Sequence, residues 1–536
     1  MRTFSCANSE RSENFGAHSK KGDIQKDVAK IITKIAVMMS KSKESKPAGS
    51  LDTPAGSVTA FFLAAPGISK KTVAWCSGSF GMSACNLFLG MLLLYYYNQV
   101  LGLSAILASA AIAVSVAFDA LSDPAVAYFS DRFSHRLGRR IPFMLLAVLP
   151  CCLLIILLFS LRLVTSQLAL FLQMTALVTL FRLFQTLYAV PRQALALELF
   201  REYDERNFIF SRSRLMAVAG EGWGLGGVLL FFLSDWNDAN GYIDASLWIA
   251  ALMFLFCGIS SWRLRKVETE FELGPTEQKS FSVSSLLLEA KKLIKNPSWQ
   301  SLLLASVLFS FNAGIDSGTG IYFDSYLWQW DPKDKFLAGF IILTGAAIGA
   351  FLATPLLSRF AKKRLAILTC IFALITAPIP LTLFIIEAHT ELKILPPSGQ
   401  GALSGLWWIY SLHGFVQAIS WGIFFICVTS MFADINEEHQ VLAGNQSEGL
   451  VMAADNLLGK LTANVGILLG GVILTWAGFD IAETAFEKEA AAINLATASV
   501  LSTVVCISCA IISLSNYRIT RESHNKNLTA LGFFKK

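Results

Sequence analysis

Two aspartates, Asp119 and Asp123, lie four residues apart in FDALSDPAVAYF, within an apolar run long enough to cross a membrane. A helix turns once in about 3.6 residues, so the two carboxylates and the Ser122 hydroxyl fall on one face. Neighbouring carboxylates repel one another, and a bound Na⁺ or a shared proton relieves the repulsion. Because hard cations prefer oxygen ligands, the three side chains predict a cation site. The alternative is a pair of structural aspartates bonded to neighbouring helices.

A lysine, Lys460, lies about twelve residues inside a later apolar segment, in NLLGKLTANVGILLGG. An ammonium group at that depth needs water or a counter-charge, and Asp119 or Asp123 across the bundle can supply one. Asn456 and Asn464 share the helical face of Lys460, which predicts a polar lining. A Lys–Asp pair that forms in one cation state and breaks in another would couple the ion to conformation. Snorkelling to the membrane surface is the alternative.

The composition around these residues is that of an integral membrane protein. The chain has 536 residues, 54% hydrophobic and 15% charged, with a mean hydropathy of +0.55. Soluble domains are about a quarter charged. The apolar runs are too long and too uniform for barrel strands, so the sequence predicts an all-α membrane protein with twelve transmembrane helices. These helices are expected near residues 72–100, 104–130, 141–163, 167–197, 208–233, 245–265, 299–328, 336–359, 364–388, 404–433, 448–478 and 490–515.

Basic residues gather in the loops on one side of these spans. DRFSHRLGRR, SRFAKKR and the linker 266–298 are basic, whereas the opposite loops are neutral or acidic. The positive-inside rule therefore places the linker and both termini in the cytoplasm, for a protein of a plasma membrane or bacterial inner membrane. The expected domains are a polar, disordered cytoplasmic tail at 1–70, a six-helix half at 71–265, the linker at 266–298, a second six-helix half at 299–515 and a cytoplasmic tail at 516–536.

Two repeated six-helix halves are the plan of the major facilitator superfamily, whose substrate site lies at the midplane between them. The loop after the second span resembles the cytoplasmic loop motif of that superfamily, roughly G-x-x-x-D-R-x-G-R-R. The resemblance rests on Asp131, Arg132, Gly138, Arg139 and Arg140. It implies a gating loop that latches conformations through charge pairs; the alternative is that the arginines only set topology.

FDALSDP is similar to D-x-x-[NST]-D-P, the span 2 signature of the melibiose permease-like glycoside–pentoside–hexuronide:cation symporters. The similarity runs through most of residues 72–515. It implies that Asp119, Ser122 and Asp123 help to bind Na⁺ or H⁺. The family also has a threonine shortly before a proline in span 4, so the resemblance makes Thr186 the fourth cation ligand.

Two later stretches carry the same resemblance. LELFREYDERNFIFSRSRLM is similar to the segment that leads to the family's span 5 arginine, which implies that Arg214 faces the cavity. MFADINEEHQVLAGNQSEGLVMAADNLLGKLTANVGILLGG resembles the span 10–11 region, with Asp434 after span 10 and Lys460 in span 11. The resemblance thus implies substrate or coupling roles for Arg214 and Lys460.

The chain departs from the family at two sugar-binding positions. Members that bind galactosides carry an aspartate in span 1 and another in span 4, where this chain has Ser83 and Ala189. A carboxylate accepts paired hydrogen bonds from neighbouring hydroxyls, and alanine accepts none. The chain therefore keeps the cation motif and not the galactoside motif. The expected substrate is a small organic solute of the sugar or glycoside class. The alternative is a lysophospholipid or another amphiphile held by Arg214 and Lys460, because the family also resembles a sodium-dependent lysophosphatidylcholine symporter.

The leading hypothesis is a secondary symporter that works by alternating access as a monomer in the lipid bilayer, with Na⁺ or H⁺ as coupling ion and no cofactor. No G-x-x-x-x-G-K-[ST] motif supports ATP-driven transport, and no nucleic-acid partner is expected. A distant alternative, an intramembrane prenyltransferase, needs two Asp-rich motifs, and the chain has one. A transporter-like receptor is a third class. Four further polar or aromatic residues in spans are candidates for substrate contact or for interhelical bonding: Asp316, His413, Gln417 and Trp421.

Overall fold

The computed structural model describes the backbone of residues 70–133, 135–162, 164, 166–200, 203–270, 295–390, 392–399, 401–402, 404–443, 448–480 and 484–530. Almost all of the expected N-terminal tail, and residues 271–294 of the expected linker, lie outside the described residues. Within the described part every regular element is helical, so the predicted all-α class is confirmed.

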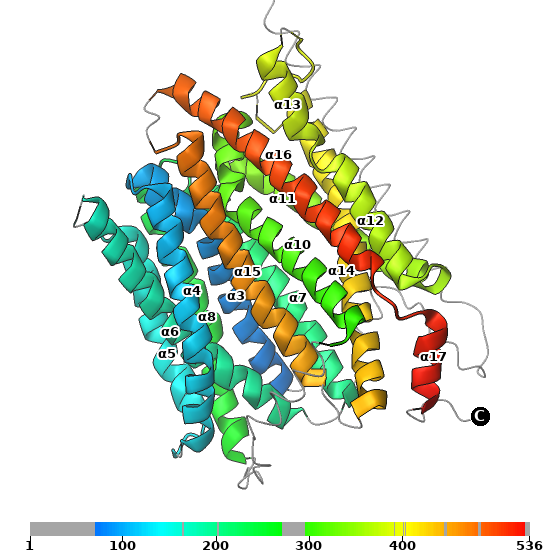
Figure 1. Cartoon of the computed structure of the whole chain (residues 1–536). Helices are drawn as coiled ribbons and strands as arrows, with labels where there is room; N and C mark the ends of the chain where they lie inside the picture. Colours follow the sequence, from blue (N-terminus) through cyan, green and yellow to red (C-terminus); the bar gives the residue numbers. More distant parts are fainter. Residues whose placement is uncertain are drawn as a thin grey trace, which may run out of the picture. The chain divides into compact units, whose positions relative to one another are not determined.

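The described helices form two groups, one before and one after the 271–294 segment (Figure 1). In the N-terminal half they are α3 (Lys70–Tyr95), η1 (Tyr96–Val100), α4 (Ala105–Arg132), α5 (Ile141–Ser160), α6 (Gln167–Leu199), α7 (Tyr203–Gly227), η2 (Val228–Phe232) and α8 (Ala239–Glu270). In the C-terminal half they are α10 (Pro297–Tyr322), η3 (Phe323–Leu327), α11 (Pro332–Arg359), α12 (Lys362–Thr376), α13 (Ile379–His389), α14 (Gly405–Ala443), α15 (Glu448–Ala477), α16 (Ala485–Ser515) and α17 (Arg521–Ala530).

The two halves repeat one packing pattern. In the first, α3 packs on α7 and α8, α4 packs on α6, and α5 packs on α6 and α8. In the second, α10 packs on α15 and α16, α11 packs on α14, and α12 packs on α14 and α16. Contacts between the halves repeat as well, since α4 meets α15 and α11 meets η2, the continuation of α7. This is the arrangement of two parallel repeats related by an axis along the membrane normal.

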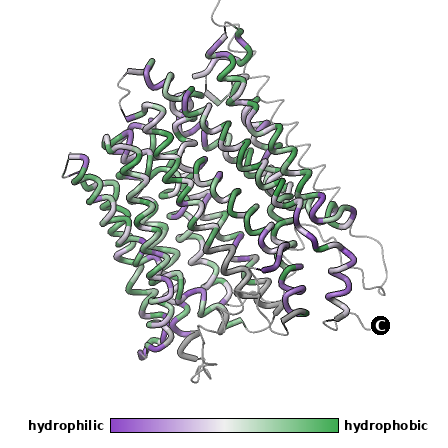
Figure 2. Tube along the Cα trace, viewed as in Figure 1, coloured by the Kyte–Doolittle hydropathy of each residue, from purple (hydrophilic) through white to green (hydrophobic). Residues whose placement is uncertain are grey.

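Eleven helices among the described residues are long and apolar enough to cross a membrane. A twelfth apolar stretch, Leu461–Ala477 within α15, is shorter, so the exact number of twelve stays a prediction. Apolar residues follow the middles of the helices, and polar residues gather towards the ends and in α17 (Figure 2). Large side chains such as Leu121 and Phe231 are exposed, which in a bundle of this kind indicates contact with lipid.

Two segments differ from the sequence-based expectation. The ninth span, expected as one helix, is broken into α12 and α13 at Ala377 and Pro378. Proline lacks a backbone donor and clashes with the preceding turn, and Pro380 follows two residues later. The expected C-terminal tail contains a further helix, α17, which packs on α14 (Figure 1).

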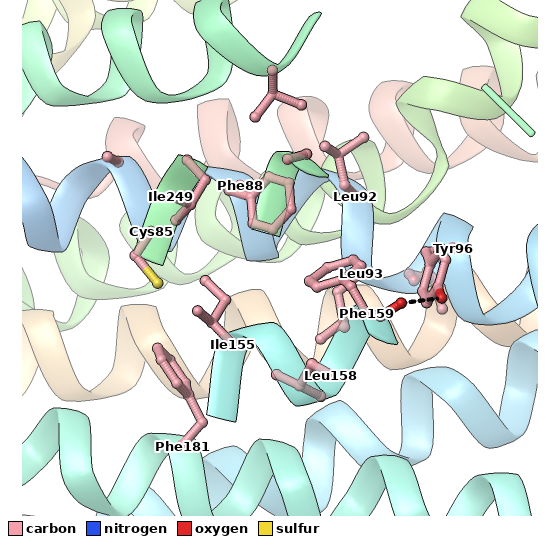
Figure 3. Close-up of a cluster of buried hydrophobic side chains, with 14 of the residues drawn as sticks. Cys85, Phe88, Leu92, Leu93, Tyr96, Ile155, Leu158, Phe159, Phe181 and Ile249 are labelled. Atoms are coloured by element: carbon pink, nitrogen blue, oxygen red, sulfur yellow. Dashed lines mark hydrogen bonds between the residues drawn. The ribbon is translucent and has the colours of Figure 1, made fainter. Parts of the chain in front are cut away.

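The core of the N-terminal half forms where α3, α5 and α8 meet (Figure 3). Phe88 and Leu92 of α3 are fully buried there with Phe159 of α5 and Ile249 of α8. The Tyr96 hydroxyl donates a hydrogen bond to the Phe159 carbonyl at 2.6 Å, which satisfies a polar group among apolar neighbours. This packing holds α3 in place as one wall of the cavity described below.

Close helix packing in the C-terminal half depends on glycine. A Cβ added at Gly314 of α10 would collide with the carbonyl oxygen of Ala463 in α15. We expect Gly314→Ala to lower the free energy of unfolding by about 1–3 kcal/mol, because a packed helix pair cannot absorb an extra methyl group without moving apart. Thermal unfolding of the purified protein measures this. Gly258→Ala, at a site in α8 with open space around it, is the matched control; equal losses would contradict the packing argument.

Candidate functional site

The two predicted carboxylates meet the predicted threonine between α4 and α6. The Thr186 hydroxyl lies 2.6 Å from Asp119 Oδ1 and 3.0 Å from Asp123 Oδ1. The hydroxyl has one hydrogen to donate, so it cannot fully satisfy both acceptors at once. The two carboxylates lie roughly 6 Å apart or less, close enough for each charge to disfavour the other. Three oxygen-bearing side chains thus converge, which is the chemistry that a hard monovalent cation or a proton requires.

An arginine that the sequence analysis missed completes this cluster. Arg182 lies one helical turn before Thr186 on α6, and its charge interacts with both Asp119 and Asp123. Its Nε donates a hydrogen bond to the Ser115 hydroxyl at 3.3 Å. Arg182 could have been identified from the sequence. It is a charged residue inside a spanning helix, four residues before the predicted ligand Thr186. Arg182 therefore places a positive charge beside the two carboxylates.

Ser122, the third residue of the predicted motif, takes a different position. Its hydroxyl donates to the backbone carbonyl of Asp119 at 3.1 Å, and the residue is 8% exposed. It is not among the described residues that line the cavity next to Asp119 and Asp123. Its role as a cation ligand stays a prediction from the resemblance.

The cluster opens into a cavity of about 620 Å³, which we call cavity 1. Most of its wall comes from α3, α4, α6 and α7 of the N-terminal half, and α10 and α15 of the other half contribute Gly318, Asn464 and Ile467. The cavity therefore lies between the halves, at the position that the two-half plan requires. Predicted residues on its wall are Ser83, Asp119, Asp123, Thr186, Ala189, Arg214 and Asn464.

A second arginine of α6 anchors the α3 side of cavity 1. Arg192 is 8% exposed and donates hydrogen bonds to the Trp75 carbonyl and to the Ser79 hydroxyl. Its guanidinium also lies over the Trp75 ring, 4.4 Å from the ring centroid. The sequence analysis did not identify Arg192, although an arginine directly after Pro191 in a span is an unusual charge.

Arg214 lines cavity 1 from α7, as the resemblance implied. Its Nη1 pairs with Glu221 Oε1 at 3.1 Å, and 69% of the Arg214 side chain is exposed. Glu221 thus has an ion-pair partner on its own helix. The Arg214 guanidinium is thus a largely exposed cationic group at the wall of the cavity. An exposed ion pair such as this one with Glu221 holds it only weakly.

The two halves are joined at one end of the bundle, which we call the Gly102 end (top in Figure 1). Asp480, from the loop after α15, accepts hydrogen bonds from Asn98 Nδ2 and from the Ala105 backbone N–H, both at 2.9 Å, and from Ser104 Oγ at 3.0 Å. Its carboxylate therefore caps the N-terminus of α4 from the opposite half, where the helix dipole favours a negative charge.

Aromatic side chains strengthen this seal. Tyr322 donates to Asn98 Oδ1 at 2.8 Å, and Tyr326 donates to Gln99 Oε1 at 2.7 Å. Trp236 of the N-terminal half donates to the Trp330 carbonyl. Cavity 1 lies on the other side of these contacts, because its lining continues along α7 to residues near the start of that helix.

The predicted gating loop lies at the opposite end, which we call the Arg140 end. Arg132 is exposed, with its guanidinium 3.6 Å from the centroid of the Tyr128 ring. Arg139 is half-buried, and Arg140 is 6% exposed at the start of α5. The side chain of Asp131 lies outside the described ones, so its expected latch role stays a prediction.

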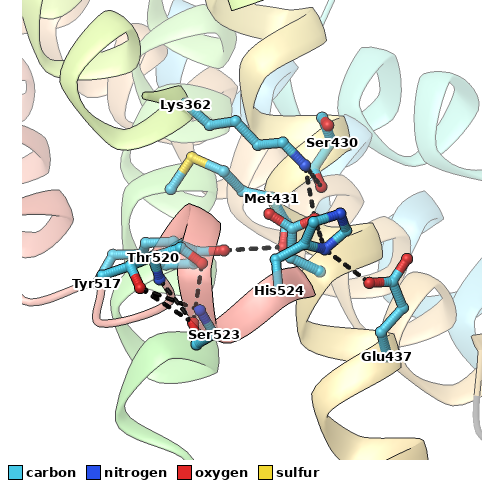
Figure 4. A network of polar contacts seen from close by, with 9 residues as sticks. Lys362, Ser430, Met431, Glu437, Tyr517, Thr520, Ser523 and His524 are labelled. Carbon is cyan, nitrogen blue, oxygen red and sulfur yellow. Dashed lines mark hydrogen bonds and ion pairs between the residues drawn. The ribbon is translucent and has the colours of Figure 1, made fainter. Parts of the chain in front are cut away.

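Asp434 takes part in a charge cluster within the C-terminal half (Figure 4). Its Oδ1 lies 2.6 Å from Lys362 Nζ and 3.2 Å from His524 Nδ1. His524 belongs to α17 and also lies 2.8 Å from Glu437 Oε2. Asp434 of α14 thus joins the first residue of α12 to α17. This arrangement could not be predicted from the sequence because α17 was not expected.

The backbone of Lys460 and Asn456 is helical, within α15, but their side chains lie outside the described ones. Asn464, one turn after Lys460, lines cavity 1. The expected pair of Lys460 with Asp119 or Asp123 therefore stays a prediction.

Comparison with known proteins places the chain in a family. Residues 74–521 match the family model described as MFS/sugar transport protein. The inner membrane symporter YicJ of Escherichia coli is 23% identical over 81% of this chain and 88% of its own length. The putative glycoside/cation symporter YagG of the same organism is 23% identical over 80% of this chain and 87% of its own. An uncharacterized symporter of Synechocystis is 33% identical, over 28% of each chain.

Solved structures confirm the fold. A bacterial homologue of the iron transporter ferroportin aligns with a TM-score of 0.56 at 12% identity, over 83% of this chain and 100% of that one. A bacterial homologue of the lysosomal transporter Spinster aligns with the same score at 13% identity, over 86% and 98%. The chain is therefore an integral membrane secondary transporter with the major facilitator fold, not an enzyme, and it belongs to the MFS/sugar transport protein family.

Proposed function

We propose that this chain is a cation-coupled symporter of a small hydroxylated solute of the sugar or glycoside class. One observation carries the proposal. The Thr186 hydroxyl lies next to the carboxylates of Asp119 and Asp123, and all three side chains line cavity 1. The names of two relatives, an inner membrane symporter and a putative glycoside/cation symporter, support symport and the substrate class.

The cation has a direct electrostatic role. With the site empty, two carboxylates face each other with Arg182 as the charged neighbour described above. A bound Na⁺ or H⁺ lowers the repulsion between Asp119 and Asp123, which both belong to α4. With Thr186 of α6 as a shared oxygen ligand, the cation also favours the arrangement in which α4 and α6 stay together. Because α4 also packs on α15, such a change is transmitted across the boundary between the halves.

The closed seal at the Gly102 end corresponds to one state of an alternating-access cycle. The basic loops lie at the Arg140 end, so the positive-inside rule places that end in the cytoplasm. On that assignment cavity 1 belongs to an inward-facing state, and both chain ends are cytoplasmic. We place the protein in a plasma membrane or bacterial inner membrane, acting as a monomer.

A second candidate substrate class is an amphiphile with an anionic head, such as a lysophospholipid. The observation that favours it is the set of arginines on the wall of cavity 1, Arg182, Arg192 and Arg214. Arg192 donates to Trp75 and Ser79, and Arg214 pairs with Glu221. Arg182 donates to Ser115 and interacts with Asp119 and Asp123. Because all three guanidinium groups already have partners within the protein, the hydroxylated solute is the better-supported class.

The test is uptake into proteoliposomes that contain the full chain, with labelled methyl glycosides and a labelled lysophospholipid. We expect an imposed Na⁺ or H⁺ gradient to drive accumulation of a glycoside, and the ion that does so identifies the coupling cation. Dissipating that gradient with an ionophore is the control. If uptake is the same with and without the Na⁺ and H⁺ gradients, the chain is not a cation symporter. If a gradient drives uptake of the lysophospholipid but of no glycoside, the proposed substrate class is wrong.

A further inference from the structure

A second cavity, of about 360 Å³, lies inside the C-terminal half, and we call it cavity 2. Its described lining residues come from α10, η3 and the residue after it, α11, the turn between α12 and α13, α13, α14 and α16. Cavity 1 and cavity 2 use different faces of α10. Gly318 lines cavity 1, whereas Asp316, Thr319 and Gly320 line cavity 2. The helix is therefore a wall shared by the two cavities.

Two charged residues, Asp316 and Lys335, line cavity 2. Asn312 Nδ2 donates to Asp316 Oδ2 at 3.1 Å, and Asn312 Oδ1 accepts from Thr503 Oγ1 at 3.3 Å. Among the described residues Asp316 has no ion-pair partner. Asp324 on η3, by contrast, is neutralised by Lys335, 2.6 Å away. Asp316 is exposed towards the cavity, so it keeps acceptor capacity for a bound molecule.

Other polar atoms around Asp316 have hydrogen-bonding capacity that the described residues leave unmet. Gln417 is 8% exposed; its Nε2 donates to Thr376 Oγ1 at 2.7 Å, while its Oε1 has no partner there. Ser499 is 3% exposed, and its hydroxyl has no partner among the described residues. His413 Nε2 lies 2.9 Å from the Thr376 carbonyl, which can only accept, so Nδ1 is the acceptor in the neutral ring. Buried polar atoms of this kind usually have a partner.

Flat aromatic side chains form the rest of the wall. Trp421 and Tyr410 of α14 line cavity 2 together with Phe323 and Trp328. Their positions are fixed by ring contacts, such as the 5.0 Å centroid distance from Trp421 to Phe309 and the 5.4 Å distance from Trp328 to Tyr410. The flat face of an aromatic side chain packs against the C–H groups of a sugar ring. Carboxylate and amide groups can hydrogen-bond to the hydroxyls at the edge of that sugar ring.

We propose that cavity 2 binds the hydroxyl-bearing ring of the transported solute, with Asp316 as acceptor for two neighbouring hydroxyls and Trp421 as stacking surface. The inference rests on the proposed function, and it names the place and chemistry of substrate recognition. Cavity 1 has Ser83 and Ala189 where galactoside-binding relatives carry carboxylates, so Asp316 supplies an acceptor that cavity 1 lacks. The volume lies near the lower limit of small-molecule sites, about 300 Å³, which suits one sugar ring better than a lipid chain.

Equilibrium binding to the purified full chain tests the proposal, with labelled methyl glycosides of glucose, galactose and xylose as probes. We expect Asp316→Asn to weaken binding of the accepted glycoside on the order of 10- to 100-fold, the usual effect of losing a charged hydrogen-bond acceptor. Asp316→Glu should restore part of the affinity. Ser499→Ala should weaken binding less, and Ser502→Ala is the matched control, because Ser502 lies on the same helix outside the cavity lining.

Binding of ²²Na⁺, and proton uptake by the same samples, separate this inference from the proposed function. Asp316→Asn should keep cation binding at the wild-type level. The assignment of cavity 2 is overturned if Asp316→Asn binds the glycoside with wild-type affinity. It is also overturned if the wild-type chain binds a cation but no glycoside. If the wild-type chain binds no cation, symport fails, whereas glycoside binding that depends on Asp316 would still support cavity 2.

Discussion

Asp123→Asn is expected to abolish cation-stimulated uptake while the protein remains folded and inserted. The substitution keeps the shape of the side chain, and its amide oxygen can still accept from Thr186, 3.0 Å away in the native chain. It removes one of the two carboxylate charges that attract the cation, while the charge of Arg182 stays in place. Losing a charged ligand of this kind costs about 3 kcal/mol, roughly a hundredfold in cation affinity. Uptake at rising Na⁺ concentration, or at falling pH, measures the effect.

Asp119→Asn should give the same result, because the Thr186 hydroxyl lies within hydrogen-bond distance of both carboxylates, so each belongs to the same cluster. Asp244→Asn is the matched control, since Asp244 is an exposed carboxylate near the start of α8 and lines neither cavity. Size-exclusion chromatography and thermal unfolding show whether each variant is folded. If cation stimulation of uptake is normal in both Asp119→Asn and Asp123→Asn, the cation does not bind at these two residues of α4.

The sequence predicted the fold class well because the membrane leaves few choices. Long apolar runs can cross a bilayer only as helices, and basic loops reveal where they turn. The break between α12 and α13 was missed, although Pro378 and Pro380 mark it, because apolarity continues through the turn. The helix α17 was missed because it is short and polar, and His524 docks it on Asp434 and Glu437, which no local pattern reveals.

The candidate site was predicted where its residues share one helix face and missed where distant segments meet. Asp119 and Asp123 could be paired from their spacing, whereas Arg182 joins them only after α4 packs on α6. Asp316 was identified as a polar residue in a span, but the cavity around it depends on five or more segments. Asp480 was part of an acidic loop, and nothing in its neighbourhood in the sequence shows that it caps α4.

The role of Asp480 leads to a second prediction with a large effect. Asp480→Ala is expected to weaken the seal at the Gly102 end, because Asn98, Ser104 and the Ala105 backbone N–H all lose their acceptor. Asp480 is exposed, so water compensates part of each lost bond, and the net cost is about 1–2 kcal/mol. A two-state equilibrium then shifts roughly tenfold towards opening at this end.

Hydrogen exchange of residues 323–331, read by mass spectrometry, is the measurement. This segment belongs to the same half as Asp480, and its own contacts across the seal go to Gln99 and Trp236 of the N-terminal half. We expect faster exchange there in Asp480→Ala, since Tyr326 and Trp330 contact the N-terminal half only while the end is closed. Asp238→Asn is the matched control: Asp238 lies at the same end, but it accepts from Ser234 and Gly241 of its own half. If exchange in 323–331 is unchanged in Asp480→Ala, the carboxylate caps α4 without holding the two halves together, and the aromatic contacts alone must close this end.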